Sequence, residues 1–202
     1  MNIFQQKPGS ARAFEATGIL LCGGSGSRFD PSGEKDKLMQ LLPSGQPVAA
    51  ESARRLLAAA GRVVAVVRPG KPALATLLSS VGCEVCVAED ASLGMSATLR
   101  RGLQAATNAD GWLLALADMP YVAEQTYRAL LDALAHGHDI VVPEYDGKRG
   151  NPVGFSRRHL PALLALSGDA GARSLLQRPE VHRVAVDDPG IRRDIDTPAD
   201  LA

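Results

Sequence analysis

The sequence predicts an α/β fold, in which a mostly parallel sheet with a small antiparallel portion lies between helices in a three-layer, Rossmann-like arrangement. Hydrophobic residues make up 46% of the chain but aromatic residues only 4%, so Ala, Leu and Val must build most of the core. Parallel strands and the helices that cover them use these residues. Short apolar runs also alternate with longer segments of helical periodicity, which indicates right-handed βαβ crossovers.

The first apolar run, residues 17–22, is predicted to be a central strand because it is short, almost wholly apolar and stopped by Gly23-Gly24. Further apolar runs predict strands, and segments with Ala and Leu at helical spacing predict helices. The predicted strands are 62–67, 84–87, 112–116 and 140–143. The predicted helices are 48–60, 73–80, 97–106 and 124–136.

The alternation of strands and helices changes after residue 143. Asp146-Gly147 is a turn signal and residues 152–155 can form a strand after it, which predicts a hairpin or an antiparallel insertion near the sheet edge. Thr197 is expected to cap a final helix that begins at Pro198. Between them we expect short helices at 158–166 and 171–178 and a strand at 182–186.

We predict a single domain over residues 17–202, because a chain of this length suits one domain, and a flexible N-terminal extension over residues 1–16. The extension lacks the apolar stretch of a signal peptide. No long apolar span follows, and the cysteines number three, which is odd for a disulfide framework. We therefore expect a cytoplasmic protein without a membrane partner.

Charge and cysteine spacing argue against two further classes of function. Lys plus Arg and Asp plus Glu both number 22, and no run of like charge could follow a nucleic-acid backbone, so nucleic acid is not an expected partner. Cys83-x-x-Cys86 has the spacing of half a zinc site, but no second pair exists. We expect these cysteines to belong to the core.

A glycine-rich loop, Cys22-Gly-Gly-Ser-Gly-Ser-Arg28, directly follows the first predicted strand. Backbone N–H groups at a strand-to-helix turn can bind phosphate, and glycine permits its close approach, so the loop predicts a phosphate site. Phe29 stands where a dinucleotide fingerprint has its third glycine, and no Gly-Lys-Ser/Thr is present. A dehydrogenase is therefore the weakest alternative, and a P-loop NTPase is not supported.

Charged residues near this loop and at a later strand end suit phosphoryl chemistry. Arg28 and Lys37 could balance the charge of a triphosphate, with Lys35 as the rival of Lys37. Asp118 follows the apolar run 112–117, at the carboxyl end of a strand, where open α/β sheets bind ligands and a carboxylate suits Mg²⁺.

Asp194-Ile-Asp196 offers a second pair of carboxylates near the C-terminus. Residues i and i+2 of a strand point the same way, so on a strand both could offer oxygens to a hard cation. Only one of them need be a ligand, because the other could cap the final helix.

In order and spacing, these motifs resemble those of the molybdenum cofactor nucleotidyltransferases, the cytidylyl- and guanylyltransferase family of Rossmann-like nucleotidyltransferases. The resemblance runs from about residue 17 to residue 201. It rests on Gly23-Gly-x-Gly-x-Arg28-Phe29, Lys37-Leu38, Ser92-Leu-Gly-Met-Ser96, Ala117-Asp-Met-Pro120, Gly150-Asn-Pro-Val153, Gly168-Asp-x-Gly-Ala-Arg173 and Asp194-Ile-Asp-Thr-Pro198.

The resemblance implies a fold of the nucleotide-diphospho-sugar transferase type and a role for each matched position. It makes Arg28, Lys37 and Asp118 catalytic, with Mg²⁺ as the cofactor held by Asp118 and Asp196, and it places Asn151 and Arg173 at the acceptor. The nucleotide-binding residues that it implies are Leu21, Cys22, Gly23, Gly24, Ser25, Gly26, Arg28, Lys37 and Ser96.

The implied reaction transfers CMP from CTP to the molybdopterin cofactor and releases pyrophosphate. A nucleoside triphosphate and a molybdopterin-type phosphorylated acceptor are thus the expected partners, with a recipient molybdoenzyme or its chaperone after them. Gly23-Gly24 is nearer to the guanylyl pattern, whereas the segments around Asn151 and Arg173 look more cytidylyl-like, so GTP is the close rival of CTP. A sugar phosphate as acceptor, or a non-catalytic nucleotide-binding module, are the further alternatives.

Overall fold

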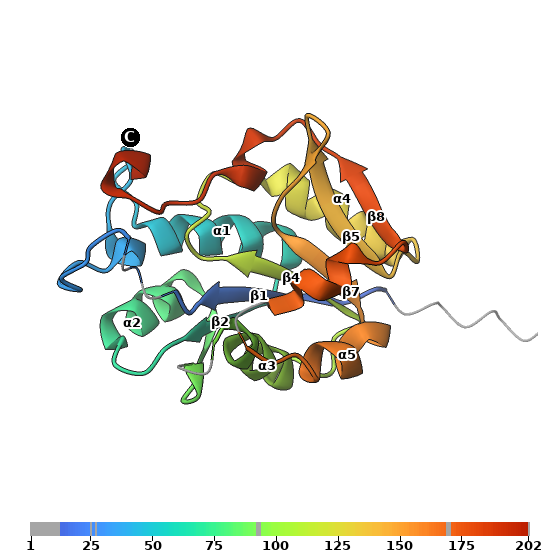
Figure 1. Cartoon of the computed structure of the whole chain (residues 1–202), viewed down its shortest axis with the longest axis horizontal. Coiled ribbons are helices and arrows are strands. Elements are labelled where there is room, and N and C mark those ends of the chain that lie inside the picture. Colours follow the sequence, from blue (N-terminus) through green and yellow to red (C-terminus); the bar gives the residue numbers. More distant parts are fainter. Residues whose placement is uncertain (1–12, 25, 27, 92–93, 169–170, 202) are drawn as a thin grey trace, which may run out of the picture.

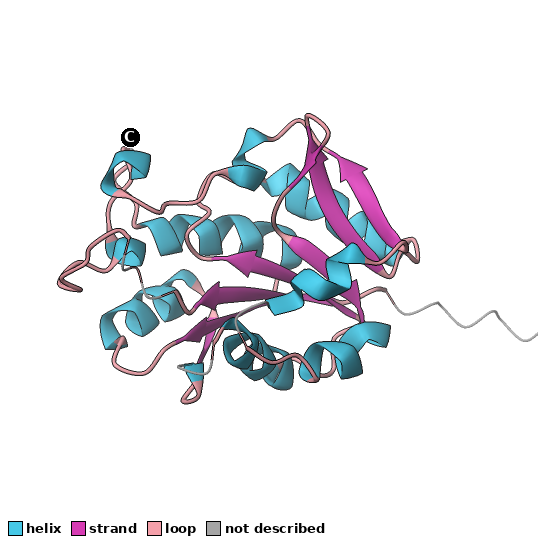
Figure 2. Cartoon of the chain, viewed as in Figure 1, coloured by secondary structure: helices cyan, strands magenta, loops and turns pink. Residues whose placement is uncertain are grey.

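The computed structural model describes residues 13–201 except 25, 27, 92–93 and 169–170 (Figure 1). These residues form one sheet of eight strands. Its strand order is β3-β2-β1-β4-β7-β5-β6, and β8 also pairs with β5. Helices lie on both sides of the sheet (Figure 2). The predicted three-layer α/β fold, mostly parallel with an antiparallel portion, is confirmed.

The parallel half of the sheet is built on the first predicted strand. This strand is central, because it pairs with β2 on one side, where Cys22 aligns with Val67, and with β4 on the other, where Leu21 aligns with Leu116. The carboxyl ends of these three strands therefore meet at one edge. The strands are β1 (Ala16–Cys22), β2 (Val63–Val67), β3 (Glu84–Val87) and β4 (Gly111–Leu116).

The predicted hairpin at Asp146-Gly147 is confirmed, since β5 and β6 pair antiparallel on either side of this turn and β6 is last in the strand order. The strand predicted to follow the turn, β7, lies inside the sheet instead of near its edge. Strand β7 pairs antiparallel with both β4 and β5, and its Val153 and Phe155 are buried. A Cβ on Gly154 would lie 2.5 Å from Cγ2 of Val141, so the flanking strands pack closely there. The strands of this half are β5 (Ile140–Tyr145), β6 (Lys148–Arg149), β7 (Val153–Ser156) and β8 (Val181–Ala185).

The helices bury alternate residues of the strands on opposite faces. Leu20 of β1 belongs to the apolar cluster that α1, α2 and α4 cover, whereas Ile19 belongs to the cluster beneath α3 and α5 (Figure 1). The sheet is thus packed between two hydrophobic layers, which hold its strands, and the residues at their ends, in place. The helices are α1 (Val48–Ala60), α2 (Pro72–Val81), α3 (Met95–Ala105), α4 (Glu124–Ala135) and α5 (Leu160–Leu164).

Short 3-10 turns stand where the sequence predicted some helices. The segment predicted as a helix at 171–178 is the 3-10 helix η4 (Gly171–Gln177), and the final helix is a single 3-10 turn, η6 (Pro198–Leu201). The glycine-rich loop leads first into η1 (Lys37–Met39), so the expected strand-to-helix turn is absent from the described chain there. Within the described residues, no helix is both long and apolar enough to cross a membrane.

Candidate active site

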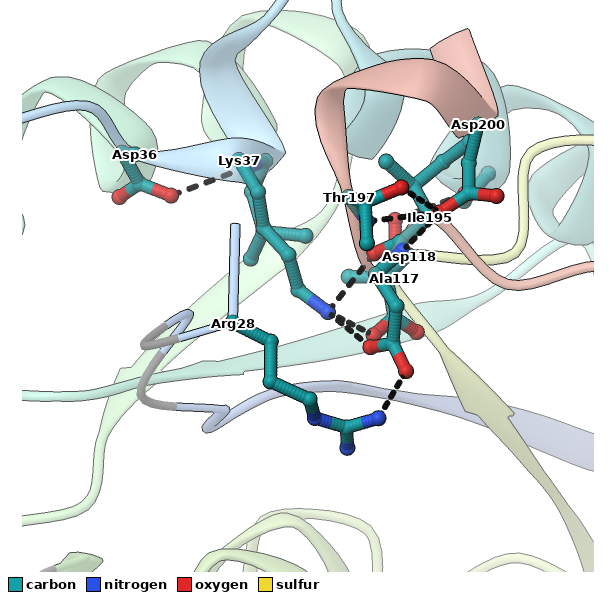
Figure 3. Close-up of polar contacts among 11 residues, drawn as sticks. Arg28, Asp36, Lys37, Ala117, Asp118, Ile195, Thr197 and Asp200 are labelled. Carbon is teal, nitrogen blue, oxygen red and sulfur yellow. Dashed lines mark hydrogen bonds and ion pairs between the residues drawn. The ribbon is translucent and has the colours of Figure 1, made fainter. Parts of the chain in front are cut away.

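Lys37, Asp118 and Asp196 meet just beyond the carboxyl end of β4, and Figure 3 shows Lys37 pointing toward Asp118. The Lys37 Nζ lies 2.6 Å from Asp118 Oδ2 and 3.5 Å from Asp196 Oδ1. It also donates a hydrogen bond to the Ile195 carbonyl oxygen at 2.9 Å. Three predicted site residues that are far apart in the sequence thus form one cluster, called the lysine–carboxylate cluster below.

Lys37 is held in the cluster by its own short helix. Asp36 precedes it as the N-cap of η1 and accepts a hydrogen bond from the backbone N–H of Leu38 at 3.0 Å. Leu38 is buried in the core and anchors the turn. The Lys37 side chain is only 9% exposed, so its ammonium group is held between the two carboxylates rather than solvated.

Asp118 is positioned by backbone contacts from three elements. Ala117 donates its N–H to Leu21 of β1 at 3.1 Å, and its carbonyl oxygen accepts a hydrogen bond from the buried Ser52 Oγ of α1 at 2.9 Å. The Asp118 carbonyl oxygen accepts from the Ile195 N–H at 2.8 Å. The Asp118 backbone is therefore fixed, while its side chain stays 21% exposed at the edge of the cluster.

Asp196 is positioned by the last turn of the chain. The Asp200 carboxylate accepts hydrogen bonds from the backbone N–H groups of Asp196, at 3.1 Å, and Thr197, at 2.6 Å, and from the Thr197 hydroxyl at 2.8 Å. Thr197 directly precedes the final turn, as predicted, but its hydroxyl donates to the Asp200 carboxylate, which is the capping acceptor. These hydrogen bonds, chiefly that from the Thr197 side chain, hold the pKa of Asp200 below its ordinary value.

The prediction that residues 194–196 form a strand was wrong, because this segment has no strand partner. Asp194 is exposed and makes no hydrogen bond or ion pair with a described residue. Only Asp196 of this pair reaches the cluster. The segment is held instead by Ile195, which is fully buried and bonded to the Asp118 backbone.

Arg28 joins the cluster from the glycine-rich loop. Its guanidinium donates to the Asp196 carboxylate, although the side chain is 79% exposed (Figure 3). The loop turns sharply before it: Gly26 has φ 68°, and its carbonyl oxygen accepts from the N–H of Phe29, whose ring is buried. A positive φ favours glycine, which explains Gly26 at this point.

The cluster balances its own charge and uses every donor of Lys37. An ammonium group has three N–H donors, and Lys37 has three acceptors, on Asp118, Ile195 and Asp196. Two cations, Lys37 and Arg28, therefore balance the two carboxylates, Asp118 and Asp196. The structure thus places Lys37 on carboxylates, and its contact with phosphate stays a prediction.

Asp118 and Asp196 fit the oxygen chemistry of a hard divalent cation, since both carboxylates approach one point, the Lys37 ammonium. Among the described residues, no group of three or more His, Cys, Asp or Glu could hold a metal ion. Two carboxylates leave most ligand positions to water and substrate oxygens, as is usual for Mg²⁺ beside phosphates.

Beside the cluster lies a cavity of about 40 Å³, the lysine cavity, between the glycine-rich loop and the start of α2. Lys35, Lys37 and Lys71 all line it, as do Gly24 and Gly26. Lys71 also forms an ion pair with Asp36 at 3.0 Å. Cationic side chains and glycine backbone thus meet in a space that suits phosphate oxygens.

A second cavity of about 350 Å³, the loop cavity, opens on the other side of Gly24. It is lined by Gly23, Arg68, Thr98 and Asp118, among others. A Cβ on Gly23 would lie 2.8 Å from Thr98 Oγ1, so glycine is required there by close approach. The cavity lies where the sequence placed the nucleotide.

Ser25 and Ser96, both predicted to bind the nucleotide, differ from the other predicted residues. Ser25 lies outside the described residues. Ser96 is fully buried, lines none of the cavities described here, and its Oγ has no hydrogen-bond partner within the described chain. Met95 and Thr98, on the same helix, line the loop cavity instead.

A third cavity, of about 480 Å³, is called the wide cavity. Asn151 and Arg173, the predicted acceptor residues, both line it, and so does Arg149, which donates to the Leu176 carbonyl oxygen. The remaining lining is largely apolar. Three residues line both this cavity and the loop cavity, namely Leu21, Met95 and Leu116.

The cysteines stay out of the chemistry of this site. Burial raises the pKa of the Cys22 thiol well above its ordinary value, so it remains protonated under the glycine-rich loop. Burial likewise raises the pKa of Cys83 to about 11, and that of Cys86. All three are free thiols that pack in or against the core, as predicted for Cys83 and Cys86.

Sequence reasoning missed three cationic residues that line these cavities: Arg68, Lys71 and Arg149. A signal was present for the first two, because both follow the second predicted strand at its carboxyl end, as Asp118 follows β4. Arg149 lies on the two-residue strand β6, beside the Gly-Asn-Pro-Val motif, which had drawn attention only to Asn151.

Residues 18–184 match the family model described as the MobA-like NTP transferase domain. Over 117 residues, the chain is 35% identical to the purine catabolism protein PucB of Bacillus subtilis. That match covers 55% of this chain and 56% of PucB, so the chain matches little more than half the length of this relative.

The solved structures of Rv0371c from Mycobacterium tuberculosis are similar over almost the whole chain. One is 28% identical, with a TM-score of 0.79, and covers 94% of this chain and 96% of that one. Another, at 28% identity and a TM-score of 0.74 over 92% and 95% of the two chains, is a complex with manganese. The molybdopterin-guanine dinucleotide biosynthesis protein A of Archaeoglobus fulgidus, 20% identical with a TM-score of 0.61 over 92% and 94%, shares the fold.

Proposed function

Because this chain belongs to the family of MobA-like NTP transferase domains and is therefore a nucleotidyltransferase, we propose that it transfers CMP from CTP to a molybdopterin-type phosphorylated acceptor and releases pyrophosphate. The observation that carries this proposal is the lysine–carboxylate cluster. Its Asp118 lines both the lysine cavity and the loop cavity, and the loop cavity shares a wall with the wide cavity. Two substrates could therefore meet beside it.

Each cavity suits one part of the reactants. The lysine cavity carries the positive charge that a triphosphate needs, and the loop cavity has the volume for a nucleoside. The wide cavity combines an apolar lining with Arg149, Asn151 and Arg173, which suits a flat acceptor that ends in a phosphate.

In the proposed reaction, an acceptor phosphate oxygen attacks the α-phosphorus in line and pyrophosphate leaves. The acceptor phosphate is ionised at neutral pH, so the chain need not supply a base. Lys35, Lys71 and Arg28 balance the charge of the leaving pyrophosphate, while Lys37 holds Asp118 and Asp196 in place. Mg²⁺ held by these two carboxylates would supply further stabilisation of charge on the phosphates.

Support for a divalent cation comes from the two convergent carboxylates and from the related Rv0371c, which has been solved in complex with manganese. Support for CTP comes from the Gly-Asn-Pro-Val and Gly-Asp-x-Gly-Ala-Arg segments, whose Asn151 and Arg173 line the wide cavity. A recipient molybdoenzyme, or its chaperone, would take up the product.

The test is to incubate the purified chain with molybdopterin cofactor, Mg²⁺ and each of CTP, GTP, ATP and UTP in turn, and to measure the dinucleotide product and pyrophosphate. We expect product with CTP. Product with GTP alone would move the assignment to the guanylyl branch. Absence of product with every triphosphate, while nucleotide still binds, would favour a non-catalytic binding module and refute the proposal.

A further inference from the structure

Arg68 is a cationic residue of the loop cavity that has no polar partner among the described residues. It directly follows β2, is half-buried, and lines the cavity together with Gly94 and Thr98. Within the described part of the chain its guanidinium makes no hydrogen bond, ion pair or ring contact. Arg62 and Arg100, by contrast, are both bound to carboxylates.

A guanidinium that lines a cavity and has no partner among the described residues is a candidate ligand-binding group. Arg68 is only half-buried and its guanidinium is not among the buried unbonded groups, so it is a charged donor that is accessible to a ligand in the cavity. Among the described residues that line the same cavity, Asp118 is the only acidic one, and it is bound to Lys37. The partner of Arg68 is therefore expected to come from outside the protein.

Under the proposed function, the partner of Arg68 is part of the nucleotide, and the charge distribution suggests which part. Lys35, Lys37 and Lys71 line the lysine cavity together with glycine backbone, and of these lysines only Lys35 has no carboxylate partner among the described residues. We therefore expect the phosphates at that cavity, where an unpaired cation and the glycine-rich loop meet. Apart from Arg68 and Asp118, the described residues that line the loop cavity are uncharged, and Ala91, Gly94 and Thr98 among them are small. A base, which is uncharged and flat, suits this part of the site better than a phosphate does.

Guanidinium chemistry then limits which base fits. Arginine offers donors in a rigid, planar fork and has no acceptor, so it matches two adjacent acceptors in one plane. Cytosine presents such a pair, O2 and N3, and guanine presents O6 and N7. Uracil has an N–H between its two carbonyl groups, and adenine has its amino group beside N1 and N7 and no second acceptor beside N3. Neither base therefore offers two adjacent acceptors to the fork.

We propose that Arg68 determines base specificity by donating two parallel hydrogen bonds to adjacent acceptors on the base, O2 and N3 of cytosine in CTP. This inference rests on the proposed function and adds to it the residue that selects the nucleotide. If the nucleotide is GTP, the same fork would bind O6 and N7 of guanine. The shared feature is a pair of neighbouring acceptors.

The experiment is calorimetric titration of CTP, GTP, UTP and ATP, each with Mg²⁺ and without acceptor, into the wild-type chain and the Arg68→Lys variant. Lysine keeps the charge but loses the fork. We expect the wild type to bind CTP at least about tenfold more tightly than UTP, and Arg68→Lys to lose about tenfold or more of the CTP affinity while UTP changes little. Arg192→Lys is the matched control, because Arg192 is exposed and lines none of these cavities.

The titration of the wild type identifies whether CTP or GTP is preferred. If the affinity for that triphosphate falls in Arg68→Lys to the level of the other triphosphates, the proposal is supported. Equal weakening of all four triphosphates, or a preference that survives the substitution, overturns it. A wild type that releases pyrophosphate with acceptor but does not discriminate CTP or GTP from UTP and ATP refutes the role of Arg68 alone. A wild type that binds no triphosphate removes both proposals.

Discussion

The lysine–carboxylate cluster and the two large cavities differ in how far the protein satisfies its own charged groups. In the cluster, every donor of Lys37 has an acceptor, and Arg28 binds Asp196. In the cavities, Arg68 and Arg173 line the walls and make no hydrogen bond or ion pair with any described residue.

This difference separates groups that are preorganised from groups that await a ligand. The cluster is held from four directions, through η1, the end of β4, α1 and the last turn of the chain, so its geometry precedes binding. Preorganised charge is what stabilises a transition state without reorganisation. Under the two proposals above, the arginines that have no partner among the described residues gain one from the substrate, so their loss should change affinity more than rate.

The largest effect is expected for Asp118→Asn. The variant removes one charge from the cluster and one ligand of the proposed Mg²⁺, so kcat should fall by about 10³-fold or more. Pyrophosphate release under saturating substrates measures it. Asp194→Asn is the matched control, because Asp194 is close in sequence to Asp196 yet lies outside the cluster. Normal turnover of a correctly folded Asp118→Asn variant would show that the cluster is not the catalytic centre.

A smaller effect, on affinity rather than rate, is expected for Arg173→Ala. Loss of one charged hydrogen-bond donor to the acceptor should raise the acceptor KM about tenfold to a hundredfold and leave CTP affinity unchanged. Steady-state kinetics with varied acceptor, and calorimetry with CTP, measure the two. A fall in kcat with an unchanged KM would mean that the wide cavity belongs to the preorganised part of the site.

Ser52→Ala tests the support beneath the cluster. The buried Ser52 hydroxyl donates to the Ala117 carbonyl oxygen, and its loss should lower the free energy of unfolding by about 1 kcal/mol and kcat by a few-fold. Thermal denaturation and turnover provide the readouts. Ser80→Ala is the control, because that hydroxyl donates only to its own helix, at the surface. Unchanged stability and turnover would show that this hydrogen bond does not fix Asp118.

The smallest effect, and one that depends on pH, is expected for Asp200→Asn. Because the folded pKa of Asp200 lies below its unfolded value of about 3.9, its stabilising effect is present above that pH and disappears as the pH falls through the folded pKa. The variant should therefore have a lower Tm than the wild type at pH 7, and the difference should vanish in strong acid. Asp132→Asn, at an exposed helical position, should show neither change. A Tm difference that persists in acid would contradict this origin.

The sequence predicted those parts of the site that depend on local pattern. The first strand, the glycine-rich loop and Asp118 follow from an apolar run and the residues directly after it, and the structure places them at one sheet edge. Arg68 follows the same rule and was overlooked because no motif marks it. Ser96 was predicted from a motif, and only the packing of α3 reveals that its side chain is buried.

Features that depend on pairing between distant segments could not be predicted. Strand β7 is inserted between β4 and β5 because Val153 and Phe155 are buried on one face and Gly154 permits close packing on the other, which no local signal reports. Asp196 reaches the cluster through Ile195 and Asp200, although the predicted strand does not exist. That Lys37 binds carboxylates follows only from how η1 packs.

The wall that Leu21, Met95 and Leu116 provide to both large cavities has a consequence for divergence within such a family. A substitution there reshapes both cavities at once, so under the proposed function a mutation that admits a new acceptor would also alter the fit of the nucleotide. Arg68 and Arg149 each line only one of the two cavities, so a substitution at either position alters one cavity without directly reshaping the other. New substrate pairs should therefore arise first through changes at these outer positions, with the common wall altered late and only together with compensating substitutions.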